Sequence, residues 1–222
     1  MGGNLDFVDY STFHSNKKIE FLNSFLKASV IATFLFLISN KTTFAQEKLV
    51  KQPIQYRLWT GYSYKSIFLL GKTENAKSAI IGVGGRKAIR KYGEKGILYY
   101  TADIIPYIYF DYPKRDDNDR FVEITGFGFS PLGLIYEQPL SSIFSYQVGL
   151  SAGFILMEEI FPTDKGRRLN YTFDPSLTIK TKLSNSLSLA TGYKFHHISN
   201  GQTGKENPGL DSNFIFLSLI IK

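Results

Sequence analysis

The 222-residue chain has no cysteine, so neither a disulfide framework nor thiol chemistry is available to it. Three histidines are too few for a histidine-rich metal site. The net charge is +7, but the basic residues form no long run and lie mostly in expected turns and near strand ends. An anionic membrane surface explains this charge as well as nucleic acid does, and we expect no nucleic-acid partner.

The apolar run at residues 28–38 is too short to cross a bilayer as a helix. Lys17, Lys18 and Lys27 precede it, and a polar stretch follows that ends in small residues at Ala45. A basic region, a short apolar core and a small-residue cleavage site are typical of a secretory signal peptide, and the alternative is a buried helix. We expect residues 1–45 to be a cleaved signal peptide and residues 46–222 to form the folded domain.

No stretch of the remaining chain shows sustained helical periodicity, and apolar and polar residues alternate with period two instead. Between Phe144 and Phe154, the even positions are apolar and the odd positions are Ser, Gln or Gly. Soluble β-sandwiches also alternate, but their apolar face points inward. Here the other face is small and polar with occasional charges, which suits the inside of a narrow membrane barrel.

We predict an all-β fold, an eight-stranded antiparallel transmembrane β-barrel. Eight is an even number, and most segments reach the roughly 9–11 residues that a tilted strand needs. The links at 138–142 and 182–185 are short, whereas those at 111–120, 158–168 and 199–210 are longer and should lie outside the cell. The expected strands are about 55–70, 78–88, 96–110, 121–137, 143–156, 169–181, 186–198 and 211–221.

Strand parity also predicts what lies inside the barrel. The glycine run Gly82–Gly85 superficially suggests a phosphate loop, but it falls within a predicted strand with no nucleotide-binding context. We favour close packing in a narrow lumen for these glycines. A charge network is expected in the same lumen, formed by Asp103, Glu123, Asp174, Lys180 and Lys194.

The segment 193–213 is the strongest candidate for chemistry. By parity, His197 and Ser199 share the largely apolar, lipid-facing side of their strand, whereas His196 faces the lumen and is expected to be structural. A histidine beside a serine is the minimum for an activated hydroxyl nucleophile. Asp211, at the start of the next strand, can meet His197 across the hairpin and orient it. The alternative is a polar extracellular rim without catalytic function.

The same segment resembles the lipid A 3-O-deacylase (PagL) family. The run His197–Asn200 matches the family's His-x-Ser-Asn, an acid follows the serine by twelve positions at Asp211, and Asn207 lies four before the acid. The resemblance implies His197 as base, Ser199 as nucleophile and Asp211 as orienting acid. It implies Asn200 or Asn207 as donors to the oxyanion. Better-known members have Glu as the acid, so Asp211 is one methylene shorter and would either need a closer strand approach or orient His197 less well.

The resemblance further implies a carboxylic ester hydrolase of the Gram-negative outer membrane. Its substrate would be lipid A, or whole lipopolysaccharide, in the outer leaflet, and the acyl chain at position 3 would be removed without metal or cofactor. Alternatives are a phospholipase-type or acyloxyacyl esterase, and an inactive structural or adhesive barrel. The oligomeric state, a homo-oligomer included, is left open. Basic residues of the predicted outer loops would either pair with lipid A phosphates or be solvated: Lys114, Arg115, Arg120, Lys165, Arg167 and Arg168.

Overall fold

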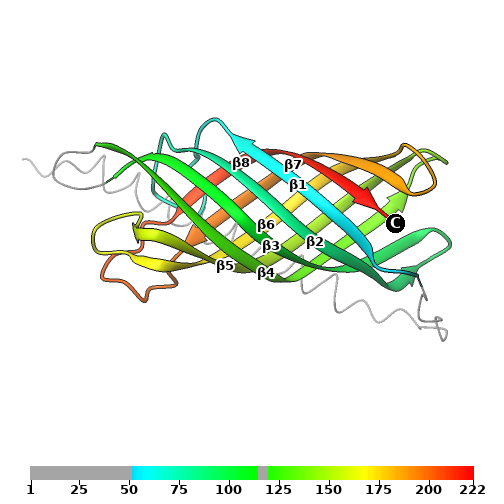
Figure 1. Cartoon of the computed structure of the whole chain (residues 1–222), viewed down its shortest axis with the longest axis horizontal. Coiled ribbons are helices and arrows are strands. Elements are labelled where there is room, and N and C mark those ends of the chain that lie inside the picture. The colour runs from blue at the N-terminus through cyan, green and yellow to red at the C-terminus, as the bar shows by residue number, and fades with distance from the viewer. Residues whose placement is uncertain (1–51, 115–119) are drawn as a thin grey trace, which may run out of the picture. The chain divides into compact units, whose positions relative to one another are not determined.

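The structure is a computed structural model that describes residues 52–114 and 120–222. The predicted signal peptide lies outside the described residues. Eight antiparallel strands form a closed barrel in which each strand pairs with its sequence neighbours and the last pairs with the first (Figure 1). Among the described residues, no helix is long and apolar enough to cross a membrane.

The predicted fold class is confirmed, and most strands lie within a few residues of the expected ranges. They are β1 (Gln55–Ser63), β2 (Lys77–Tyr92), β3 (Gly96–Pro113), β4 (Phe121–Pro139), β5 (Phe144–Phe161), β6 (Arg167–Lys182), β7 (Leu187–Ser199) and β8 (Leu210–Ile221).

One prediction was wrong: β1 ends at Ser63, not near residue 70. The apolar residues that follow suggested a longer strand, but the chain leaves the β1–β2 ladder at Ser63 and turns toward β8. The Ser63 hydroxyl accepts a hydrogen bond from the backbone N–H of Asn213 and donates to the carbonyl of Lys65. We call residues 64–76, which join β1 to β2, the first loop. It lies at the same end of the barrel as the β7–β8 connection, residues 200–209.

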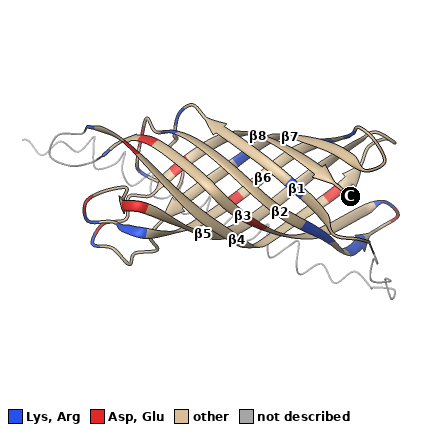
Figure 2. Ribbon diagram, in the orientation of Figure 1, with Lys and Arg blue, Asp and Glu red and all other residues tan. Residues whose placement is uncertain are grey.

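The outer wall of the barrel is apolar, as expected for a transmembrane barrel, and the lumen holds charged and polar side chains beside an apolar cluster that includes Trp59, Phe110 and Phe214. Large apolar side chains on the outer wall are strongly exposed, such as Ile215 at 70% and Leu132 at 64%. Buried Arg, Asp, Glu and Lys side chains lie in the lumen instead. Figure 2 shows few charged positions along the middle of the strands and more toward their ends and the connections.

The lumen holds the predicted charge network, with one error. Asp103 pairs with Arg57, and Lys180 pairs with Glu137. Asp174 accepts from His196, and the Lys194 ammonium lies 4.0 Å from the centre of the Trp59 ring. Glu123 was wrongly assigned to this network, because it lies on the exposed side of β4, where the alternate residues are buried.

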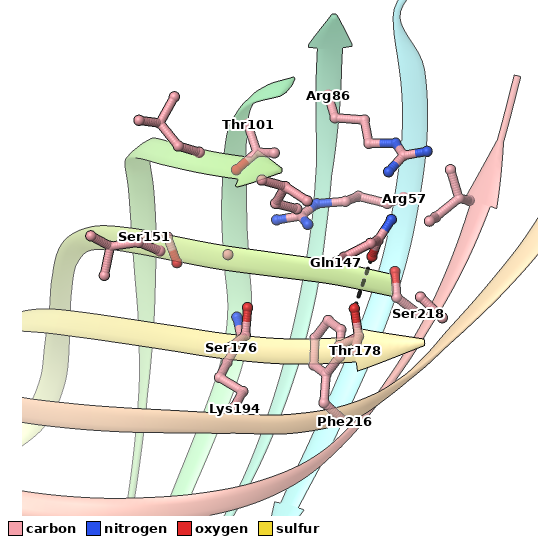
Figure 3. Close-up of a pocket in the computed structure, with 16 residues that line it drawn as sticks. Arg57, Arg86, Thr101, Gln147, Ser151, Ser176, Thr178, Lys194, Phe216 and Ser218 are labelled. Atoms are coloured by element: carbon pink, nitrogen blue, oxygen red, sulfur yellow. Dashed lines mark hydrogen bonds between the residues drawn. The ribbon is translucent and has the colours of Figure 1, made fainter. Parts of the chain in front are cut away.

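These side chains fill the barrel. Figure 3 shows Arg57, Arg86 and Lys194 pointing inward with polar side chains of neighbouring strands, among them Gln147, which accepts a hydrogen bond from Thr178 at 2.9 Å. The cavity that remains between them is about 20 Å³, enough for roughly one water molecule. This part of the lumen therefore has no room for a lipid-sized molecule.

Two of the three glycines in the β2 run, Gly82 and Gly84, have the packing role predicted for them, and Gly85 does not. A side chain at Gly82 would collide with the Trp59 ring, and one at Gly84 would collide with Asp103. Glycine at these two positions lets Trp59 and the Arg57–Asp103 pair occupy the narrow lumen.

Candidate active site

The ladder of β7 and β8 brings His197 directly opposite Asp211. Nδ1 of His197 lies 2.6 Å from Oδ1 of Asp211, a short hydrogen bond in which the ring N–H donates to the carboxylate. The shorter acid does not prevent the contact, since direct cross-strand partners have their Cβ atoms about 5 Å apart. With Nδ1 occupied, Nε2 is the nitrogen left to act as a base.

Asp211 is fully buried although its parity points it to the outer wall, where Ile215 and Leu217 of the same strand are exposed. The first loop covers it. The backbone N–H groups of Leu69, Leu70 and Gly71 donate to Oδ2 of Asp211 at 2.9, 2.6 and 2.8 Å. The carboxylate thus has one oxygen on the histidine and the other on three consecutive amides, which satisfies a buried charge.

Ser199 lies on the outer face, two residues beyond His197 on the same strand. Its cross-strand partner in β6 is Tyr171, whose side chain is 49% exposed on the outer wall, and directly paired residues share one face of a sheet. Ser199 itself is half-buried. Within the described chain its hydroxyl forms no hydrogen bond, so the structure places Ser199 on the same face as His197 without joining the two.

The two candidate oxyanion donors are linked to each other in the β7–β8 connection. The backbone N–H of Asn200 donates to Oδ1 of Asn207 at 2.9 Å. The Asn200 side chain is fully buried, and its Nδ2 donates to the carbonyl of Glu206 at 2.7 Å. No hydrogen bond is seen from Nδ2 of Asn207 to any described residue. Asn200 therefore braces the connection, while Asn207 keeps a free amide donor.

A glycine packs directly against the histidine ring. Gly209 has a φ of +64°, and a side chain there would come within 3.0 Å of Cε1 of His197. Glycine accepts this left-handed backbone conformation at little cost, whereas other residues are strained in it. Gly209 thus allows the β7–β8 connection to close over His197.

Four of the basic residues in the predicted outer loops have partners within the chain: Lys114, Lys165, Arg167 and Arg168. Lys165 pairs with Glu206 at 2.9 Å, and this hydrogen bond lowers the pKa of the Glu206 carboxyl. Lys114 pairs with Asp164 at 2.5 Å. Nε of Arg167 and of Arg168 donates to the carbonyls of Thr203 and Met157. Arg115 lies outside the described residues.

His196 faces the lumen, as predicted. Its Nδ1 lies 2.5 Å from Oδ1 of Asp174, and its Nε2 is buried without a hydrogen-bond partner among the described residues. No group of three or more metal-binding side chains occurs in the described ranges.

A family model supplies the comparison that decides the family. The model described as lipid A 3-O-deacylase (PagL) matches residues 83–219. The chain belongs to this family. The match runs from the middle of β2 almost to the end of β8, so it includes His197, Ser199 and Asp211 but not the first loop. A search of curated protein sequences found no match.

Two solved structures share the PagL barrel. A crystal structure of the outer membrane enzyme PagL superimposes with a TM-score of 0.52 at 15% identity, covering 74% of this chain and 97% of that one. Neisserial surface protein A gives a TM-score of 0.50 at 12% identity, covering 76% and 96%. At these identities the likeness shows the fold alone.

Sequence reasoning missed the contribution of the first loop to the site of this PagL family member. The contacts to Asp211 come from backbone amides of Leu69–Gly71, and a backbone donor has no residue type that could mark it. The lumen partners Arg57, Arg86 and Glu137 were also missed, although the parity of each within its own strand offered a signal.

Proposed function

We propose that this protein hydrolyses the ester-linked acyl chain at position 3 of lipid A, with Ser199 as nucleophile, His197 as base and Asp211 as the orienting acid. The observation that supports it best is the 2.6 Å bond between His197 Nδ1 and Asp211 Oδ1 on the outer wall, next to Ser199 along the same strand. A base oriented by a buried carboxylate, with a hydroxyl beside it, is the arrangement used for nucleophilic acyl transfer. The family match supports lipid A as the substrate.

The reaction proceeds in two steps. Oγ of Ser199 attacks the ester carbonyl while Nε2 of His197 takes its proton, and His197 then returns this proton to the departing sugar oxygen. In the second step Nε2 of His197 takes a proton from a water molecule, which attacks the acyl-serine carbonyl. The bond between this carbon and Oγ of Ser199 then breaks, His197 returns the proton to Oγ, and the fatty acid is released. The Asp211 carboxylate stabilises the imidazolium that forms in each step. A shift that brings Oγ of Ser199 to Nε2 of His197 would accompany substrate binding, since catalytic hydrogen bonds often tighten only in the complex.

Charge develops on the carbonyl oxygen during both attacks, and a positioned donor stabilises it. We assign this donor to Nδ2 of Asn207, because the other end of the same amide is held by the backbone N–H of Asn200. Asn200 contributes by holding the connection, with its own Nδ2 on the Glu206 carbonyl.

The location of the site suits a membrane lipid. We place the protein in the outer membrane of a Gram-negative bacterium, after cleavage of residues 1–45, with the first loop and the β7–β8 connection at the outer leaflet. His197 and Ser199 then meet an ester of lipid A while the lipid stays in the membrane. The filled lumen is consistent with a substrate held against the outer wall.

The test uses the purified full barrel folded in detergent and offered either lipopolysaccharide or phospholipid vesicles. We expect fatty acid to be released from lipopolysaccharide and lipid A to lose the acyl chain at position 3, as seen by mass spectrometry. Release from phospholipid alone would indicate a phospholipase-type esterase. Release from neither substrate, by protein with the gel mobility of a folded barrel, would contradict the proposal and indicate a structural or adhesive barrel.

A further inference from the structure

The first loop forms a clamp over the start of β8. Leu69, Leu70 and Gly71 direct three consecutive backbone N–H groups at one carboxylate oxygen, Oδ2 of Asp211, and the N–H of Ile67 donates to the Asp211 carbonyl at 3.2 Å. Successive backbone amides that converge in this way form an anion-binding nest. The acid beside His197 is therefore held by a segment about 140 residues away in sequence.

The clamp is attached to the β7–β8 connection by further bonds. The N–H of Lys72 donates to the carbonyl of Pro208 at 2.6 Å, and the Thr73 hydroxyl donates to the carbonyl of Gly209 at 2.7 Å. Thr73 also forms a parallel bridge with Leu210. The loop thus lies against the residues that immediately precede Asp211.

Internal bonds and close packing fix the shape of the clamp. The buried Ser66 hydroxyl donates to the carbonyl of Thr73 and accepts from the N–H of Ala76. Gly71 is buried against β8, where an added Cβ would lie 2.8 Å from the backbone N of Leu210 and 2.9 Å from the carbonyl carbon of Gly209. Any side chain at residue 71 would push the loop away from Asp211.

Because of the nest, the two carboxylate oxygens of Asp211 have different roles. Three donors on Oδ2 stabilise the negative charge of a fully buried Asp211 and prevent the carboxylate from rotating. Oδ1 is then held toward Nδ1 of His197. Because the aspartate side chain is short, its carboxylate can contact the loop amides and the histidine together only when it is held in this one orientation.

We propose that the first loop belongs to the active site. The backbone amides of Leu69–Gly71 position Asp211. Within the loop, Gly71 and Thr73 are positioning residues. This inference rests on the proposed function for its kinetic consequences. Its structural consequence, the orientation of Asp211 toward His197, is independent of that function.

The kinetic test compares Gly71→Ala and Thr73→Val with Gly85→Ala in the full barrel. At Gly85 an added Cβ would lie 3.4 Å from Ile54 and 3.8 Å from the carbonyl oxygen of Gln55, both ordinary contacts, so this variant controls for the substitution itself. We expect Gly71→Ala and Thr73→Val to lower kcat on lipid A by about 10- to 100-fold with KM nearly unchanged. In an Asp211→Asn background, the same two changes should produce no further loss, because the group they position is gone.

The second measurement needs no turnover. In ¹⁵N-labelled barrel, the ring nitrogen signals of His197 report its hydrogen bond to Asp211, and those of His196 serve as an internal control. We expect Gly71→Ala to move the His197 signals toward their position in Asp211→Asn, while Gly85→Ala leaves them in place.

His197 signals that coincide with those of the unaltered protein, or kcat losses that multiply fully in the Asp211→Asn background, would overturn the clamp. A wild-type barrel that releases no fatty acid would sink the proposed function alone, and the His197 signals would still decide the clamp. Should Gly71→Ala fail to fold, Thr73→Val, which keeps the shape of the side chain, gives the same readouts.

Discussion

His196 and His197 are adjacent in the chain, yet they bond to carboxylates on opposite sides of the barrel wall. His196 pairs inward with Asp174 of β6, and His197 pairs outward with Asp211 of β8. Both contacts are short, at 2.5 and 2.6 Å, and both use Nδ1. Only the outer pair can reach a lipid, because His196 and Asp174 are both buried inside the barrel.

This opposition predicts different losses from the same substitution at the two histidines. His197→Asn should reduce ester hydrolysis by about three orders of magnitude or more while the barrel stays folded. His196→Asn should keep most of the activity and lower the free energy of unfolding by about 1–3 kcal/mol, because Oδ1 of the buried Asp174 loses its bond to the histidine. Turnover and urea-driven unfolding in detergent measure the two effects. Equal activity losses in both variants would contradict the assignment.

Asp211 should tolerate neither a loss of charge nor an added methylene. Asp211→Asn removes the charge that stabilises the imidazolium and should lower kcat by about 10²- to 10⁴-fold. Asp211→Glu should also slow the reaction, although glutamate is usual in the better-known members the sequence resembles, because the buried aspartate already contacts both His197 and the first loop. Single-turnover rates on lipid A test both changes. A harmless Asp211→Asn would remove this residue from the site.

Gly209 and Gly93 offer a matched pair for the packing against His197. Both have positive φ, +64° and +59°, so alanine strains the backbone similarly at each. A side chain at residue 209 meets Cε1 of His197, whereas one at residue 93 meets nothing within 4 Å. We expect both variants to lose about 1 kcal/mol of stability but only Gly209→Ala to lose kcat as well. A comparable loss of kcat in Gly93→Ala would assign the effect to strain alone.

Acyl-chain preference should depend on the outer wall below the site. Ile215 of β8 is the cross-strand partner of Tyr193 of β7, and its side chain is 70% exposed. Ile215→Trp would change the surface along which the acyl chain lies, and the ratio of rates on short and long acyl chains should shift. Leu132→Trp on β4, across the barrel, adds similar bulk at a position 64% exposed and should leave that ratio unchanged. Competition assays with lipid A of mixed acyl length measure it.

Strand parity explains why much of this structure could be predicted. A period of two assigns each side chain of a strand to one wall, so the lumen position of His196 and Asp174 and the outer position of His197 follow from the sequence. Parity fails where a loop folds back over a wall. Asp211 has outward parity but is fully buried, because the first loop covers it. The loop itself was mistaken for a longer β1, because its apolar residues, such as Ile67 and Phe68, resembled a continuing strand. The contacts of Leu69–Gly71 are made by backbone amides, so the residue types in this segment could not predict them.

Hydrolysis of lipid A by Ser199 is tested most directly in the lipid A of cells that express this chain. The host is a strain whose own lipid A carries the acyl chain at position 3. One culture expresses the unaltered chain and a second expresses Ser199→Ala. With the unaltered chain, we predict a mass lower by one acyl group replaced by hydrogen, with fragmentation placing the loss at position 3. With Ser199→Ala, present in equal amount as a folded barrel in the outer membrane, the lipid A mass should stay that of the host. Unchanged lipid A with the unaltered chain, or the same loss with Ser199→Ala, would contradict hydrolysis by Ser199.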